Sequence, residues 1–363
     1  MVILHIASIT GSPYNGVCVA APQHVIHQGT YARTALLNIN NIQIPGVPRQ
    51  LSYSRPFRIE ILEKPFDRPD LVVFHECYRP AYLEIGRHLH RRAIPYIILP
   101  HGELRREAQQ RKWLKKKTAN LLLFNRFIRQ AAAIQCLSEA ELRATKFGKR
   151  KFVGTNGIRI PSARKTDFSE QGVRFIYIGR YEWHAKGLDL LFDAIQAKAD
   201  FLKQNQCTFT LYGPNLGTRF ETVNAMVRER GLESLVSTNL EIDGEQKKEA
   251  LLLSDIFFQT SRYEGMPMGI LEALSYGIPC LVTAGSTLGD VIRNGKAGWA
   301  ADTTAAGIAE CLERAVRDRT AWREYGENAR NLVRRYAWDK VSADTLEYYS
   351  RLLCQEVEDG YKN

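Results

Sequence analysis

The sequence of 363 residues lacks the features that mark several classes of protein. No apolar run approaches the roughly 18 to 20 residues that a membrane-spanning helix needs. The first residues show neither the basic leader nor the long apolar centre of a signal peptide. The seven cysteines are scattered, with no Cys-x-x-Cys spacing and no zinc-like pairing with His. We therefore expect a protein of the reducing cytoplasm that is neither inserted into a membrane nor exported by that route.

Two further absences concern acidic residues. No Asp-x-Asp occurs anywhere in the chain, so a chelated metal has little support and none is expected. Acidic side chains are also scarce in the first 150 residues, which hold 23 Lys and Arg against 10 Asp and Glu, a net +13. The remaining residues hold 27 against 29, a net −2. The excess of positive charge therefore lies entirely in the first part of the chain.

Much of this charge lies in residues 105–129, where nine basic side chains stand against one Glu. Apolar residues are interspersed at partly helical spacing, which is typical of a basic amphipathic helix. Such a helix suits an anionic surface, either lipid headgroups or nucleic acid, while a solvated charged face is the simpler alternative. The basic residues assigned to a membrane or acceptor surface are Arg105, Arg106, Arg111, Lys112, Lys115, Lys116 and Lys117.

The composition, 45% hydrophobic and 25% charged, is that of an ordinary globular protein, and the length favours two domains. Strand-like runs alternate with helical patterns, which predicts parallel sheets covered by helices on both faces. The first series has strands at 2–7, 71–75, 96–100 and 133–137 and helices at 80–92 and 104–129. The second has strands at 174–179, 208–212, 256–259 and 279–283 and helices at 187–198, 218–230, 245–253 and 267–276.

The polar, aperiodic stretch 156–172 is the natural linker between the two series. We place an N-terminal domain at 1–162, a C-terminal domain at 163–335 and a helical segment at 336–363. Because ligands bind at the carboxyl ends of parallel strands, we expect the site in a cleft between two facing sheets.

The most informative stretch is 261–283, SRYEGMPMGILEALSYGIPCLVT. Glu264 precedes a predicted helix and Glu272 lies inside it. Pro267 favours a first helical turn, whose free backbone amides attract phosphate, and the neighbouring glycines allow close approach of a ligand. Glu272 could accept both hydroxyls of a ribose. The residues assigned to donor binding here are Gly265, Met266, Pro267, Met268, Gly269 and Glu272.

This stretch resembles the paired-glutamate signature of retaining glycosyltransferases of family 4, which have the two-domain GT-B fold. The resemblance extends upstream to IGRYEWHAKG, where Arg180 and Lys186 match the two cations that hold the donor diphosphate in that family. It implies an α/β protein of two Rossmann-like, doubly wound domains facing across a cleft, with a C-terminal helix that crosses back to the N-terminal domain.

The first domain carries a thinner resemblance. Leu99-Pro100-His101-Gly102 ends a predicted strand and is similar to the family's cleft histidine, which implies that His101 contacts the donor sugar. Asn15 and Gly16 stand where the family usually carries two glycines beside the reacting sugar. With Glu264, Arg180 and Lys186, His101 completes the expected catalytic set.

The resemblance implies a retaining, metal-independent, hexosyltransferase-like enzyme that needs no cofactor. Its donor would be a nucleotide diphosphate sugar and its acceptor a glycan or lipid-linked saccharide, in cell-surface polysaccharide or glycolipid assembly. We expect it in the cytoplasm, peripheral at the inner face of the cell membrane, with no nucleic acid partner. Two alternatives are a nucleotide-sugar epimerase of related fold and a basic binding protein without catalysis.

Overall fold

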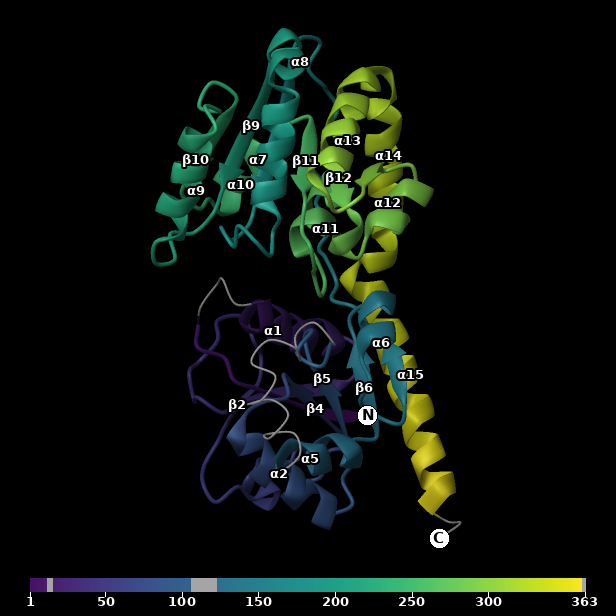
Figure 1. Cartoon of the computed structure of the whole chain (residues 1–363). Helices are drawn as coiled ribbons and strands as arrows, with labels where there is room; N and C mark the ends of the chain where they lie inside the picture. Colours follow the sequence, from purple (N-terminus) through teal and green to yellow (C-terminus); the bar gives the residue numbers. More distant parts are fainter. Residues whose placement is uncertain (12–15, 106–122, 361–363) are drawn as a thin grey trace. The chain divides into compact units, whose positions relative to one another are not determined.

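The computed structural model describes residues 1–11, 16–105 and 123–360 and divides into two compact units (Figure 1). Unit 1 contains Met1–Gly157 together with the C-terminal segment that starts at Trp338, and unit 2 contains Ile158–Ala337. The sequence places these boundaries at 162/163 and 335/336. Residues of the expected linker pack within unit 2, where Lys165 N donates to the Tyr276 carbonyl.

Unit 2 is a six-stranded parallel sheet in the order β10-β9-β8-β11-β12-β13. Its strands are β8 (Val173–Ile178), β9 (Cys207–Tyr212), β10 (Val236–Asn239), β11 (Ile256–Gln259), β12 (Cys280–Thr283) and β13 (Gly298–Ala301). Its helices are α7 (Leu188–Ala197), α8 (Ala199–Gln204), α9 (Arg219–Glu229), α10 (Gly244–Leu253), α11 (Met268–Ser275), α12 (Gly289–Asn294), α13 (Ala305–Arg317) and α14 (Trp322–Val333).

Alternate residues of the central strands face opposite sides of this sheet, as the two-residue period of a strand requires. Phe175 and Phe258 join the core under α7, α9 and α13, whereas Ile176 and Phe257 join the core under α10, α11, α12 and α14. Because both faces are covered, these strands read as continuous apolar runs in the sequence.

Unit 1 is a seven-stranded parallel sheet in the order β3-β2-β1-β4-β5-β6-β7. Its strands are β1 (Val2–Ala7), β2 (Arg33–Asn38), β3 (Gln50–Ser52), β4 (Leu71–His75), β5 (Tyr96–Leu99), β6 (Ala133–Cys136) and β7 (Lys151–Val153). Its helices are α1 (Gly16–Gln28), α2 (Pro80–Arg91), α5 (Asn125–Gln130), α6 (Glu139–Ala144) and α15 (Trp338–Gly360).

Helix α15 returns the end of the chain to unit 1, where Figure 1 shows it beside β6 and α6. Its first residue, Trp338, stacks on His27 of α1 and lies against Gly157, where a Cβ atom would come within 2.3 Å of the indole. Further along, the Tyr349 hydroxyl donates to Gln135 Oε1 of β6 at 2.6 Å. Two parallel α/β units and this returning helix are the arrangement that the sequence predicts.

The sequence misses five short strands: β2, β3, β7, β10 and β13. Each lies at or next to an edge of its sheet and contains polar or small residues that interrupt its apolar run, so no continuous run marks it in the sequence. The helix expected at 104–129 is wrong at its start, where Leu104 lies in a turn and Arg105 forms an isolated bridge with Thr145. Most of the remainder lies outside the described residues, before α5.

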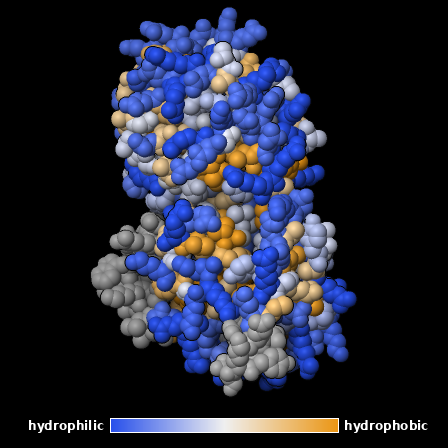
Figure 2. Space-filling model, turned by 90° about the vertical axis from the view of Figure 1, so that its right-hand side faces the viewer, coloured by the Kyte–Doolittle hydropathy of each residue, from blue (hydrophilic) through white to orange (hydrophobic). Residues whose placement is uncertain are grey.

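The described helices include none that is long and apolar enough to cross a membrane. Hydrophilic residues cover most of the face in Figure 2, interrupted by smaller groups of hydrophobic residues.

Candidate functional site

The candidate site of unit 2 lies where its strand order reverses. Strand β8 pairs with β9 on one side and with β11 on the other. Because these strands are parallel, the loops that follow β8 and β11 both start at the carboxyl end of the sheet. Ligands of open α/β sheets bind at such a switch point. These two loops contain Arg180, Lys186 and Glu264, which the sequence singles out.

Glu264 is the centre of a compact hydrogen-bonded cluster. Its Oε1 atom lies 2.5 Å from Lys186 Nζ and accepts hydrogen bonds from Gln259 Nε2 at 2.7 Å and Ser261 Oγ at 2.6 Å. The Lys186 and Glu264 side chains are only 16% and 13% exposed. An ion pair so far removed from water is held rigidly, and its charges act strongly on a nearby ligand.

Glycine and hydrogen bonds hold the two loops together. Gly187 has φ +62°, and a Cβ atom there would come within 2.1 Å of the Thr260 carbonyl oxygen. The Thr260 hydroxyl donates to the carbonyls of Lys186 and Gly187. Only glycine permits this backbone approach.

A second clamp joins the same loops at Arg262. Its guanidinium binds both carboxylate oxygens of Asp189, at 2.6 and 2.7 Å, and its backbone N–H donates to the Ala185 carbonyl. Although burial raises the pKa of Asp189, the Arg262 guanidinium holds it below its usual value. The clamp therefore persists at neutral pH.

Helix α11 begins at Met268, one residue later than the sequence predicts. Pro267 is the N-cap residue, because its carbonyl accepts the first helical hydrogen bonds from Ile270 and Leu271. Pro267 therefore connects the first turn of α11 to the loop that carries Glu264 and Gly265. Met266 packs against the core under α11.

Glu272 projects from α11 and forms an ion pair with Lys247 of α10, each side chain being 27% exposed. Arg180 is 47% exposed and lies 3.6 Å from Glu182, which also binds Arg219 at 3.0 Å. Lys247 and Arg219, the cations that pair with Glu272 and Glu182, are not singled out by the sequence.

In unit 1, His101 follows β5 in the left-handed region, with φ +48°. The N–H of Gly102 donates to Glu141 Oε1 at 2.7 Å, and the N–H of Leu137 donates to the other oxygen of that buried carboxylate. His101 Nε2 lies 3.1 Å from His75 Nδ1. Burial, with a smaller contribution from His24, lowers the pKa of His101 to about 3, so its ring is neutral at physiological pH.

Not every residue assigned from the sequence is described. Gly16 begins α1, whereas Asn15, Arg106, Arg111, Lys112, Lys115, Lys116 and Lys117 lie outside the described residues. Arg105 is partly buried. The structure thus brings together Lys186 and Glu264, and joins His101 to His75.

The residues missed by the sequence leave different signals. Gln259 ends β11 and Ser261 opens the conspicuous string 261–283, so their short distance from Glu264 along the chain could have indicated them. Lys247 reads as one more basic residue on a polar helix, and nothing in the sequence pairs it with Glu272. His75 ends a strand as His101 does, but only the sheet order places β4 beside β5.

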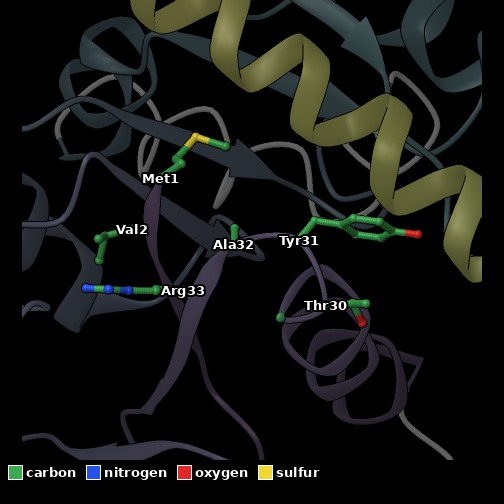
Figure 3. A pocket seen from close by; sticks show the side chains of 7 residues that line it. Met1, Val2, Thr30, Tyr31, Ala32 and Arg33 are labelled. Atoms are coloured by element: carbon green, nitrogen blue, oxygen red, sulfur yellow. The ribbon is translucent and has the colours of Figure 1, made fainter.

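A pocket of about 510 Å³ lies at the end of the unit 1 sheet where β1 and β2 begin. Figure 3 shows Met1 and Val2 at the start of β1 and Arg33 at the start of β2 around it. It therefore lies at the amino ends of the strands, away from His101. Within the described part of the chain, no group of three or more His, Cys, Asp or Glu side chains is arranged to hold a metal ion.

Part of the chain is similar to known proteins. Residues 159–332 match the family model described as "Glycosyl transferases group 1". The N-acetyl-alpha-D-glucosaminyl L-malate synthase of Bacillus anthracis is 30% identical over 146 residues, 39% of this chain and 36% of that protein. The lipopolysaccharide 1,6-galactosyltransferase of Salmonella typhimurium is 34% identical over 116 residues, 30% of this chain and 29% of that protein.

The match to these curated relatives thus spans about a third of their length. Among solved structures, Anabaena HepE in complex with UDP has a TM-score of 0.73 at 16% identity, covering 97% of this chain and all of that one (100%). This likeness shows the fold, which is GT-B.

Proposed function

We propose that this chain is a retaining glycosyltransferase of family 4. It moves a sugar from a nucleotide diphosphate sugar to a glycan or lipid-linked saccharide during polysaccharide or glycolipid assembly. The observation that carries the proposal is the Lys186–Glu264 pair, held by Gln259 and Ser261 at the switch point of a sheet within the residues that match the group 1 family model.

Donor binding uses the two loops of unit 2 and the start of α11. Lys186 and Arg180 hold the diphosphate, because fixed cations compensate its charge. The backbone amides at the start of α11, from Met268 and Gly269, add hydrogen bonds to the phosphate oxygens. Glu272 accepts the hydroxyls of the ribose through its carboxylate, whose other contact is Lys247.

In the reaction, the bond between the sugar's anomeric carbon and the phosphate oxygen breaks as a bond to the acceptor oxygen forms on the same face. The acceptor hydroxyl gives its proton to the departing phosphate oxygen, so no protein base is required. Lys186 and Arg180 stabilise the negative charge that develops on the diphosphate. Glu264 faces the positive charge that develops on the sugar, and His101 orients the sugar through its neutral ring.

Unit 1 binds the acceptor. Its net positive charge and the basic segment 105–129 suit an acceptor carried on an anionic membrane surface. The similarity to a lipopolysaccharide galactosyltransferase supports an acceptor of this kind. The protein works at the inner face of the cell membrane.

No metal ion takes part, since protein cations perform the charge compensation at the diphosphate. The chain contains no Asp-x-Asp to chelate one. No other cofactor is needed, because transfer of the sugar requires no redox chemistry.

The test is a panel of nucleotide sugars incubated with the full chain and a mixture of saccharide and lipid-linked acceptors. We expect release of a nucleoside diphosphate from one donor, a product with the donor's anomeric configuration by NMR, and full activity in EDTA. Glu264→Gln should abolish release, while Lys340→Met, which removes an exposed charge on α15, should not.

Other outcomes would overturn the proposal. Conversion of a donor into its epimer without nucleotide release would indicate an epimerase. Binding of no donor at all would indicate a basic binding protein. Activity lost to EDTA and restored by magnesium would contradict the metal-independent mechanism alone.

A further inference from the structure

The loop after β8 packs not only against the loop after β11 but also against the segment that follows β9. A Cβ atom at Gly213, the first residue after β9, would come within 2.4 Å of the Gly179 carbonyl oxygen. The Tyr181 hydroxyl donates to the Asn239 carbonyl at the end of β10 at 2.7 Å, and the Tyr181 ring lies against that of Phe220 in α9. These contacts fix the start of α9 beside the loop after β8.

The first residue of α9 is Arg219, and its guanidinium meets that of Arg180 at a single atom. Arg219 Nη1 lies 3.0 Å from Glu182 Oε1, and Arg180 Nη1 lies 3.6 Å from the same oxygen. Neither guanidinium forms another hydrogen bond or ion pair with the described residues. The two side chains are 43% and 47% exposed, so most of their N–H donors remain accessible to a ligand.

The stability of α9 does not account for a cation at this position. The partial charge at the N-terminus of a helix is positive, so Arg219 opposes the helix dipole in the first turn. Its ion pair with Glu182 is partly exposed, and pairs of this kind contribute little to stability. The role of Arg219 is therefore to be sought in the loops around it.

The charge balance of these loops gives Arg219 a role. Each cation of the loops that follow β8 and β11 has one carboxylate as its partner, and the pairs are Arg180–Glu182, Lys186–Glu264 and Arg262–Asp189. These three pairs carry no net charge. Arg219 has no carboxylate of its own among the described residues and shares Glu182, so it gives the cluster one positive charge in excess. An anion at the carboxyl end of this sheet is attracted by that charge.

We propose that Arg219 is a further donor-binding residue, which binds the diphosphate of the nucleotide sugar together with Arg180. Two guanidiniums held at one carboxylate oxygen can bind neighbouring phosphate oxygens, because each still offers several N–H donors. Glu182 allows them to lie side by side, since it compensates one of their two charges. The proposal rests on the proposed function for the identity of the anion as the diphosphate of a sugar donor.

The test is calorimetric titration of the full chain with UDP, ADP and GDP, repeated on variants with the diphosphate that binds most tightly. Arg219→Gln should weaken its affinity about tenfold, the effect of one lost charge-assisted hydrogen bond. The difference from the wild type should shrink as salt rises, because the lost contribution is electrostatic. Arg228→Gln is the matched control, because Arg228 is an exposed arginine of the same helix outside this cluster.

A second measurement separates phosphate binding from a structural role. The parent nucleoside carries no phosphate, so it should bind to the wild type and to Arg219→Gln with equal affinity in an NMR titration. The midpoints of urea unfolding of the two proteins should also agree, since the ion pair with Glu182 is partly exposed.

An Arg219→Gln protein that binds the diphosphate as tightly as the wild type overturns the proposal, and so does an equal loss of affinity for the nucleoside. A wild type that binds none of the three diphosphates overturns it as well. Absence of any sugar transfer by a chain whose diphosphate affinity depends on Arg219 would instead refute the proposed function and leave this anion site standing.

Discussion

At the scale of single residues, Glu264 and Lys186 form a nearly buried ion pair, so their effects on stability and on catalysis can be separated. Removing one partner leaves a charge without compensation, whereas removing both leaves two neutral side chains of similar volume. The pair therefore permits a double-mutant test of its chemical role.

We expect Lys186→Met and Glu264→Gln to lower the free energy of unfolding by about 3 to 5 kcal/mol each at most, and the double variant to regain much of this loss. All three should lose at least about a hundredfold in kcat/KM, because the charges are needed as the diphosphate leaves. Urea unfolding and donor turnover measure the two effects. A double variant with wild-type turnover would contradict the catalytic assignment. Arg180→Ala, at an exposed position, should lower turnover without loss of stability.

Removing the carboxylate of Glu272 tests its proposed contact with the ribose. Glu272→Ala should weaken binding of the donor's nucleoside diphosphate about 10- to 100-fold, since hydrogen bonds to a charged acceptor contribute about 1.5 to 3 kcal/mol. Calorimetry measures this affinity. Glu245→Ala, which removes an exposed carboxylate of α10, is the control. Unchanged affinity in a folded Glu272→Ala protein would exclude the ribose assignment.

At the scale of elements, the loop before α7 and the loop after β11 act as one body because Gly187 lets their backbones touch. A second glycine offers a matched comparison. Gly217 has nearly the same backbone, with φ +66°, but a Cβ atom there would meet nothing within 4 Å.

Gly217→Ala should therefore cost only the strain of a left-handed residue, about 1 kcal/mol of unfolding free energy. Gly187→Ala adds a collision with the Thr260 carbonyl and should cost clearly more, while also weakening donor binding because Glu264 moves with its loop. Urea unfolding and calorimetry on both variants measure this. Equal costs for the two substitutions would show that the loops are not held in contact.

At the scale of the whole molecule, the buried histidines of unit 1 link stability to pH. Burial lowers the pKa of His5 and of the partly buried His101 to about 3, that of His24 to about 4, and that of His75 well below its usual 6.5. The unfolded chain then binds more protons than the folded one below about pH 6.5. The contribution of these neutral rings to the free energy of unfolding is therefore fully present above this pH and is lost as the pH falls toward 4.

Each such histidine should contribute a slope of about 1.4 kcal/mol per pH unit in this window. Urea unfolding at pH 7, 6 and 5 should show the loss, with a shallower slope in His24→Gln and an unchanged slope in the exposed variant His90→Gln. A free energy of unfolding that does not change between pH 7 and 5 would show that these rings are not held neutral.

The positive charge of the molecule predicts electrostatic binding to anionic membranes. Binding to vesicles should require anionic lipid and weaken with salt, because each basic residue near the surface contributes roughly 1 kcal/mol at most. Changing Lys115, Lys116 and Lys117 together to Gln should reduce cosedimentation. Changing the exposed Arg228, Arg293 and Arg323 of unit 2 removes equal charge and should not. Equal effects of the two triple changes would remove the membrane assignment and leave the glycosyltransferase proposal intact.

The sequence by itself determined the α/β class, the two units and the central strands, because buried parallel strands are long apolar runs separated by helical periods. It also determined the loop between Ser261 and Pro267 and the glycine-containing loop after β8. Their residue types and spacing carry chemical meaning before folding. The strands at or next to the sheet edges escaped because polar and small residues interrupt their apolar runs.

Only the tertiary structure decided which side chains meet. Lys186 and Glu264 are 78 residues apart along the chain, and His5 and His75, whose ring nitrogens lie 3.0 Å apart, are separated by 70 residues. Sheet order sets these contacts, since it places β8 beside β11 and β1 beside β4. The physical reason is that the hydrogen bonds of a parallel sheet join segments distant in sequence, and no local pattern records which strand becomes the neighbour of which.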